Sequence, residues 1–220
     1  MASHPTPAAR APRVHVIHPL VVRVTHWINA FAIVCMVMSG WAIYNASPMF
    51  PFSFPDWATL GGWLGGSIGW HFAAMWLLVA NGVLYVSYGI GAGHFRRHFL
   101  PLHLRDVARD AVRAATFKLP HQPGVYNAVQ RLLYLGVLLL GVLIVASGLS
   151  IWKPVQFFWL TDLFGGFDFA RRVHFAAMAG IVAFVLVHLS LVLLVPSTLL
   201  PMFTGRAKTH DTISERKGQA

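Results

Sequence analysis

Four long apolar runs limit what this chain of 220 residues can fold into. They cover about residues 20–44, 68–90, 128–151 and 173–195. At a helical rise of about 1.5 Å per residue, each run is long enough to cross the roughly 30 Å hydrocarbon core of a bilayer. Charged residues make up only 11% of the chain, and no Asp or Glu lies within a run. The sequence therefore predicts an all-α integral membrane protein with four transmembrane helices in one domain.

The distribution of Lys and Arg predicts how these helices are oriented. Fourteen of the 17 Lys and Arg residues fall on one side of a four-helix topology, and only Lys153, Arg171 and Arg172 fall on the other. Because cytoplasmic loops are enriched in Lys and Arg, both termini are predicted to be cytoplasmic. The predicted parts of the chain are a cytoplasmic N-terminal segment, a four-helix domain and a basic cytoplasmic tail, at residues 1–19, 20–195 and 196–220. The net charge of +10 is then explained by this bias and by attraction to membrane lipid, so no nucleic-acid partner is expected.

An internal duplication relates the two halves of the chain. The pentapeptide His-Phe-Ala-Ala-Met occurs at His71–Met75 and again at His174–Met178. The first and third runs also align, Met36–Tyr44 against Ile144–Trp152, with a shared Ser-Gly in the middle. Two helix pairs repeated in tandem predict a four-helix bundle with its sites between the two halves.

Four histidines, His26, His71, His174 and His188, lie within these runs or at their ends. Ionisable residues at membrane depth are rare and usually functional. On the last helix, His174 and His188 are about 21 Å apart along the axis and about 40° apart around it. The alternating helix directions put His71 level with His174, and His26 level with His188. The sequence therefore predicts two histidine pairs at two depths.

Two such pairs are what bis-histidine ligation of two b-type haems requires, because each iron takes one imidazole from each side of the macrocycle. A zinc or non-haem iron site would need three or four ligands converging on one point, often with carboxylates. The single cysteine, Cys35, excludes a CxxCH haem attachment and an iron–sulfur cluster within the chain. We therefore predict non-covalent haem with His26, His71, His174 and His188 as the iron ligands.

Five further residues are predicted to contact the haems. Gly40 and Gly148 would let the macrocycles approach the helix backbone. Arg23, one turn before His26, is a candidate partner for a propionate of the inner haem, and Arg171 and Arg172 are candidates at the outer one. The other eight histidines are expected to be exposed, with His18 as the one substitute for His26.

Two loops complete the sequence-based topology. Residues 92–125 form a basic cytoplasmic connector that is expected to lie on the lipid head groups. Residues 45–66 contain no Lys or Arg and are rich in Phe, Trp, Pro and Gly. This outer segment fits either an aromatic belt at the membrane interface or a docking surface for a partner.

Several short elements occur together across about residues 18–200. They are Arg23-Val24-Thr25-His26-Trp27, Ser39-Gly40-Trp41, Trp70-His71-Phe72, Ser147-Gly148-Leu149 and His174 with His188. As a set they resemble the bacterial di-haem cytochrome b family, which includes bacterial cytochrome b561 and the cytochrome b subunits of nickel–iron hydrogenase, formate dehydrogenase and thiosulfate reductase.

The resemblance implies a multi-pass protein of the bacterial cytoplasmic membrane. It also implies pairing of His26 with His188 and of His71 with His174, and quinone chemistry beside the inner haem. The residues considered for quinone contact are Asn29, Asn127 and Gln130.

Three hypotheses for function follow. In the first, the chain carries electrons between the quinone pool and a periplasmic oxidoreductase subunit of hydrogenase or molybdenum-enzyme type, which it also anchors. In the alternative, it is a stand-alone cytochrome b561 oxidoreductase that couples a small periplasmic redox species, such as superoxide, to quinone. The non-redox hypothesis is a four-helix membrane scaffold without a cofactor.

Overall fold

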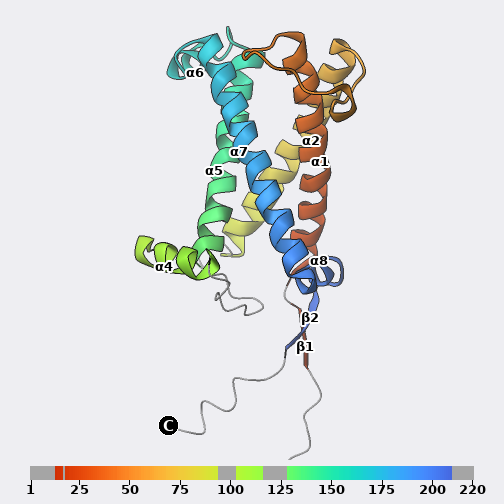
Figure 1. Ribbon diagram of the computed structural model, residues 1–220, viewed down its shortest axis with the longest axis vertical. Coiled ribbons are helices and arrows are strands. Elements are labelled where there is room, and N and C mark those ends of the chain that lie inside the picture. The colour runs from red at the N-terminus through yellow and green to blue at the C-terminus, as the bar shows by residue number, and fades with distance from the viewer. Residues whose placement is uncertain (1–12, 17, 94–102, 116–127, 210–220) are drawn as a thin grey trace, which may run out of the picture.

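Four long helices form the body of the protein in a computed structural model, which describes residues 13–16, 18–93, 103–115 and 128–209 (Figure 1). The elements in chain order are β1 (Arg13–Val16), α1 (Leu20–Ala46), η1 (Asp56–Ala58), α2 (Leu64–Gly91), α4 (Leu104–Ala115), α5 (Ala128–Trp152), α6 (Phe158–Leu163), α7 (Phe167–Leu194), η2 (Pro196–Thr198), α8 (Leu199–Thr204) and β2 (Arg206–Thr209). Helices α1, α2, α5 and α7 are each long and apolar enough to cross a membrane. The predicted four-helix membrane bundle is therefore confirmed.

The bundle is built from the two helix pairs that the duplication indicated. Helix α1 packs on α2, and α5 packs on α7. Helix α7 slants across the bundle, from α5 at one end to α8 and the start of α1 at the other (Figure 1). We call the end with α4, α8 and the two strands the inner end, and the end with α6 the outer end. Both described ends of the chain lie at the inner end, as the Lys and Arg distribution predicted.

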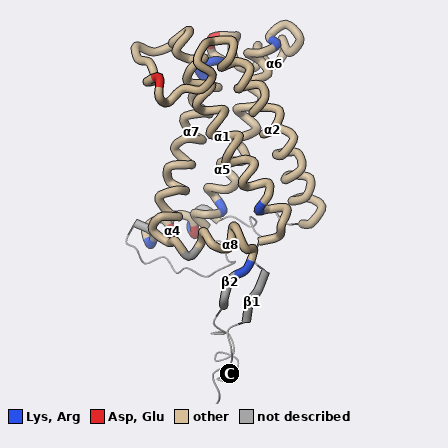
Figure 2. Tube along the Cα trace, turned by 90° about the vertical axis from the view of Figure 1, so that its right-hand side faces the viewer, with Lys and Arg blue, Asp and Glu red and all other residues tan. Residues whose placement is uncertain are grey.

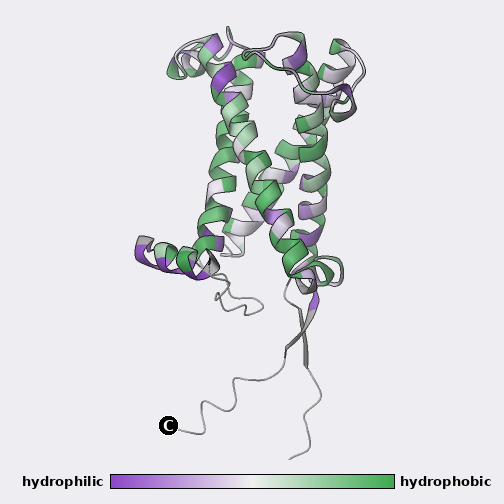
Figure 3. Cartoon of the chain, viewed as in Figure 1, coloured by the Kyte–Doolittle hydropathy of each residue, from purple (hydrophilic) through white to green (hydrophobic). Residues whose placement is uncertain are grey.

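The interior of the bundle is made of small side chains. The buried residues of the four long helices include Thr25, Ala32, Cys35, Ser39, Ser67, Ala74, Asn81, Ser147, Ser150, Ala170 and Ala177. Large apolar side chains instead point outward, and the middle of each helix is hydrophobic (Figure 3). Lipid tails are as apolar as Leu, so burying Leu brings little gain, whereas small residues allow helix backbones to approach closely. Lys and Arg lie at the two ends of the bundle (Figure 2).

The outer segment after α1 folds back onto the helices. The side-chain amide of Asn45 donates to the Phe54 carbonyl at 2.8 Å and accepts from the Phe54 N–H at 2.9 Å. The Phe54 ring stacks on Trp41 with ring centres 4.5 Å apart. From α7, Arg171 donates to the Ser47 carbonyl at 2.6 Å. The segment therefore covers the outer ends of α1 and α7.

Part of this outer segment still presents aromatic rings to its surroundings. Trp57 and Trp63 are 84% and 74% exposed. These rings fit both sequence-based interpretations of residues 45–66, the interfacial belt and the docking surface.

At the inner end, α4 projects sideways from the foot of α5, roughly at right angles to the long helices (Figure 1). Arg109 and Asp106 form an ion pair at 3.4 Å, and Asp110 accepts a hydrogen bond from the Ala128 N–H at 2.9 Å. The second contact ties α4 to the first residue of α5. The orientation fits the expectation that the connector lies along the membrane surface.

A short clip joins the N-terminal and C-terminal segments. Strands β1 and β2 pair antiparallel, with Arg13 opposite Thr209, and the His18 N–H donates to the Gly205 carbonyl at 3.3 Å. The apolar pattern did not predict these strands, because four residues are too few for a recognisable alternation. Gly205 turns the chain between α8 and β2 with φ of +76°.

We expect Gly205→Ala to destabilise this clip. An alanine at this φ costs about 1–2 kcal/mol, and its Cβ would also lie 3.0 Å from the His18 carbonyl oxygen and 3.1 Å from Arg23 Nε. The control is Gly62→Ala, because Gly62 has a similar φ of +73° but nothing within 4 Å of the added Cβ. Thermal unfolding in detergent should show a larger loss for Gly205→Ala. Equal losses would mean that the contacts with His18 and Arg23 contribute nothing.

Candidate functional site

The structure brings the four membrane histidines together as two pairs across the boundary between the helix pairs. His71 on α2 faces His174 on α7, with ring centres 6.4 Å apart and an interplanar angle of 65°. His26 on α1 faces His188 on α7 at 6.0 Å and 62°. We call these the outer pair and the inner pair. Their role as iron ligands stays a prediction.

The separation of the rings matches two imidazoles on opposite sides of one metal. With a metal–nitrogen bond of about 2 Å and roughly 1.1 Å from the nitrogen to the ring centre, two trans imidazoles have centres about 6.3 Å apart. Both measured separations lie close to that value. Each pair could therefore hold the iron of a porphyrin between its two imidazoles.

A hydrogen bond to Ser39 determines the tautomer of His71. Ser39 Oγ lies 2.6 Å from the Cys35 carbonyl and donates its single proton there. The same oxygen lies 3.0 Å from His71 Nδ1, so it accepts and Nδ1–H donates. A neutral imidazole protonated on Nδ1 keeps a lone pair on Nε2. Nε2 of His71 is therefore the nitrogen available to a metal.

The second half of the chain repeats this arrangement around His174. Ser147 Oγ donates to the Leu143 carbonyl at 2.8 Å and lies 3.1 Å from His174 Nδ1. His174 Nδ1 is also 3.1 Å from the Ile144 carbonyl, which only accepts. Nδ1 of His174 is therefore protonated, and its Nε2 is also available to a metal. The donor set of the outer pair fits bis-histidine ligation.

Two glycines make room for these rings. A Cβ on Gly40 would lie 3.4 Å from Cε1 of His71, and one on Gly148 would lie 3.2 Å from Cε1 of His174. The sequence analysis assigned both glycines to the approach of the macrocycles. In the structure, the nearest atoms belong to the histidine rings themselves. The glycines therefore make room for the imidazoles, so that each ring can lie against the neighbouring helix, and not directly for a macrocycle.

The inner pair has different surroundings. His26 contacts Trp27 edge to face, with ring centres 5.3 Å apart, and His188 stacks on Phe184 at 5.9 Å. Within the described part of the chain, no hydrogen bond to either ring of the inner pair is found. Aromatic packing, rather than a serine, therefore surrounds the inner rings.

A buried amide next to the inner pair was missed by the sequence analysis. Asn81 on α2 donates to the Thr25 carbonyl and to Asn29 Oδ1, both at 2.7 Å. The sequence feature that could have identified it is an Asn within an apolar run, because polar side chains at membrane depth usually face the interior of a bundle. Of the residues considered for quinone contact, Asn29 is thus engaged by Asn81, Gln130 lies in the first turn of α5, and Asn127 lies outside the described residues.

The three arginines expected near propionates have protein partners or an exposed position. Arg23 donates through Nη1 to the Phe203 carbonyl of α8, and its Nε is buried without a hydrogen-bond partner in the described chain. Arg171 binds Ser47, and Arg172 is exposed. Of the three, Arg23 is the one that has a buried N–H without a hydrogen-bond partner in the described chain.

His18, the substitute considered for His26, belongs to the clip. Its backbone N–H donates to Gly205, and its ring is half-buried. Burial, with a smaller contribution from the Arg23 guanidinium, lowers the pKa of His18. The ring is therefore neutral at neutral pH. Among the other histidines, His103 is exposed before α4, while His94, His98 and His121 lie outside the described residues.

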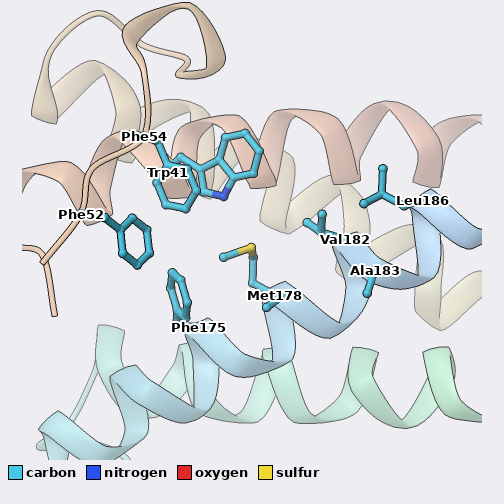
Figure 4. Close-up of a pocket in the computed structure, with 9 residues that line it drawn as sticks. Trp41, Phe52, Phe54, Phe175, Met178, Val182, Ala183 and Leu186 are labelled. Atoms are coloured by element: carbon cyan, nitrogen blue, oxygen red, sulfur yellow. The ribbon is translucent and has the colours of Figure 1, made fainter. Parts of the chain in front are cut away.

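An open groove of about 350 Å³ lies between α1, the outer segment and α7, and neither His71 nor His174 is among the residues that line it (Figure 4). Its walls are apolar and include Trp41, Phe54, Phe175 and Met178. The indole nitrogen of Trp41 is on the side of the ring that faces α7 (Figure 4), and it is buried with no partner among the described residues. A buried N–H without an acceptor costs about 1–3 kcal/mol. An apolar wall with one unsatisfied donor fits an apolar ligand that carries an acceptor group.

Comparison with known proteins gives matches over most of the chain. The model of the prokaryotic cytochrome b561 family matches residues 17–205, which include all four long helices and all four paired histidines. A putative protein-methionine-sulfoxide reductase subunit, YedZ1 of Azospira oryzae, is 51% identical over 193 residues. That alignment covers 87% of this chain and 98% of the relative.

Proposed function

The chain belongs to the prokaryotic cytochrome b561 family, and from this premise we propose that it holds two b-type haems and carries electrons across the membrane to a partner on the outer side. Membership of the family confirms the resemblance seen in the sequence and the assignment as a multi-pass bacterial membrane protein. It also implies haem b and electron transport in general terms. The number of haems, their ligands, the quinone and the partner are parts of the proposal.

The observation that carries the proposal is the presence of two histidine pairs with the ring separation of axial ligands. His71 and His174 would hold the outer haem, and His26 and His188 the inner one. The two positions on α7 are about 21 Å apart along the helix, so the pairs lie near opposite membrane faces. A relay across the bilayer needs one site near each face.

When bound, a bis-histidine haem supplies reversible one-electron transfer and has no open coordination position for a substrate. The residues of the chain bind and orient it. Ser39 and Ser147 hold the outer imidazoles with Nε2 free, and Trp27 and Phe184 pack against the inner imidazoles. Trp41 would donate its unused N–H to an acceptor of the outer haem, and Arg23 would donate its Nε to the inner one.

The name of the relative supports a specific outer partner, protein-methionine-sulfoxide reductase, which the sequence analysis did not name. Reduction of a sulfoxide to a thioether consumes two electrons and two protons and releases water. In this proposal electrons leave the membrane subunit on its outer side. Because each haem carries one electron at a time, two successive transfers through the relay supply the two electrons for each sulfoxide. Quinol on the inner side is the proposed donor, as the resemblance implied.

The family match itself is to a cytochrome b561, and it favours the alternative stated in the sequence analysis over an anchor subunit of hydrogenase type. In that alternative the outer reactant is a small redox species, such as superoxide, and no second subunit is needed. Both versions use the same two haems. They differ in what meets the outer end, where Trp57 and Trp63 are exposed.

We expect purified protein to contain two b-type haems per chain that acid acetone extracts, because the chain has no CxxCH attachment site. His71→Ala and His174→Ala should each remove the same haem, and His26→Ala and His188→Ala the other, since each change removes one axial ligand of a pair. The measurement is the haem-to-protein ratio together with the reduced-minus-oxidised spectrum.

The control for these variants is His103→Ala, an exposed histidine before α4, which should keep both haems. If His26→Ala and His71→Ala remove the same spectral component, the ligand assignment is wrong. A haem content near zero in the protein without substitutions would show that the proposed function is wrong.

We expect quinol-dependent reduction of methionine sulfoxide when the membrane protein is reconstituted with a periplasmic protein-methionine-sulfoxide reductase. His71→Ala should abolish this turnover, because the outer haem is lost, yet leave the inner haem reducible by a quinol analogue. Unchanged turnover with the outer haem missing would show that the haems do not act in series. Turnover with superoxide, and none with the reductase, would instead establish the alternative.

A further inference from the structure

The strongest unexplained feature of the bundle is a Ser-Gly pair that appears twice in the same relation to a histidine. Ser39 and Gly40 on α1 face His71 on α2, as Ser147 and Gly148 on α5 face His174 on α7. We call these two units the twin Ser-Gly brackets. We infer that the brackets fix the outer imidazoles as Nδ1–H donors and thereby lower the reduction potential of the outer haem. This inference rests on the proposed ligation of that haem.

In each bracket the histidine Nδ1–H donates the hydrogen bond and the serine oxygen accepts it. Each serine hydroxyl already donates to the carbonyl four residues earlier, at 2.6 Å for Ser39 and 2.8 Å for Ser147. Each oxygen is then an acceptor toward the ring. Both serines are fully buried, so water does not compete for the imidazole proton.

The glycine of each bracket affects the orientation of the imidazole ring. Its missing side chain leaves Cε1 of the ring 3.4 Å from the Cβ position at Gly40 and 3.2 Å at Gly148. The distance at Gly148 is shorter than most Cβ contacts, and the distance at Gly40 is an ordinary van der Waals contact. The edge of each ring that carries Nδ1 and Cε1 therefore lies against the bracket helix, and this contact together with the hydrogen bond restricts rotation about the Cβ–Cγ bond. Each bracket sets both the proton position and the orientation of one imidazole.

The effect on potential follows from the electronic state of the ligand. A hydrogen bond from Nδ1–H to an oxygen increases the basicity of the imidazole, and a more basic ligand stabilises ferric over ferrous iron. The outer pair has two such bonds from the brackets, whereas neither ring of the inner pair has a hydrogen bond within the described residues. The brackets therefore separate the potentials of two sites that otherwise share the same ligand type.

Redox titration of the purified holoprotein, followed in the haem absorption bands, tests this inference. Ser39→Ala and Ser147→Ala should each keep two haems and shift only the outer component to a more positive potential, and the double variant should shift it further. The haems should be retained because His71 and His174 keep carbonyl acceptors, those of Met36 and Ile144.

The matched control is Ser190→Ala. Ser190 donates to the carbonyl four residues earlier at 2.8 Å and lies two residues from His188, but it contacts no histidine ring. This variant should leave both potentials unchanged. Ser39→Cys keeps the side-chain size and replaces the acceptor with a weak one, so it should shift the outer component in the same direction as Ser39→Ala.

A second measurement follows the orientation of the rings. Gly148→Ala and Gly40→Ala should change the low-spin electron paramagnetic resonance signal of the outer haem, and the change should be larger for Gly148→Ala, where the contact is tighter. The signal of the inner haem should stay the same in both.

The outcomes separate this inference from the proposed function. If His71→Ala removes a haem but the serine variants leave the outer potential where it was, the brackets do not tune the haem and the inference is wrong. A shift of both haems together, or an equal shift in Ser190→Ala, would also overturn it. If His71→Ala keeps two haems, the ligation itself is wrong and the proposed function fails with it.

Discussion

Polar side chains inside this bundle must find their partners within the protein, because the lipid around it offers none. This constraint explains why the few buried polar groups occur in matched sets. Ser39 meets His71, Ser147 meets His174, and Asn81 meets the carbonyl of Thr25. Each set joins the two helices of one pair, so the same bonds that satisfy the polar groups also fix how the pair is packed.

The two helix pairs meet at the outer end, where Arg171 binds Ser47 and the Phe175 ring lies 5.2 Å from that of Tyr44, and the paired histidines face one another between them. Small buried residues bring the helices of a pair close together, and the imidazoles face across the boundary between pairs. A cofactor bound there would complete the contact between the halves of the bundle. Haem binding and assembly of the four helices are therefore expected to be coupled.

The duplication also explains why the two histidine pairs differ. The outer pair consists of the two histidines at equivalent repeat positions, so both retain the Ser-Gly bracket. The inner pair consists of His26 and His188, whose equivalents in the other repeat are Tyr134 and Tyr85. The outer pair thus keeps the symmetry of the repeat. The inner pair departs from it, and its rings pack against aromatic side chains. In the proposed relay, this difference would give two unlike haem sites on a duplicated scaffold.

The sequence by itself determined the four spans, their orientation, the repeat and the four histidines, because hydropathy, charge bias and internal similarity are properties of the local chain. Helix direction also indicated which histidines share a depth. Only the tertiary structure decided that Ser39 and Ser147 hold the outer rings, that Asn81 ties α2 to α1, and that Arg23 reaches the carbonyl of Phe203. These contacts depend on how far each helix is rotated and tilted against its neighbour. A run that is apolar on every side leaves that rotation undefined, and packing between the helices fixes it.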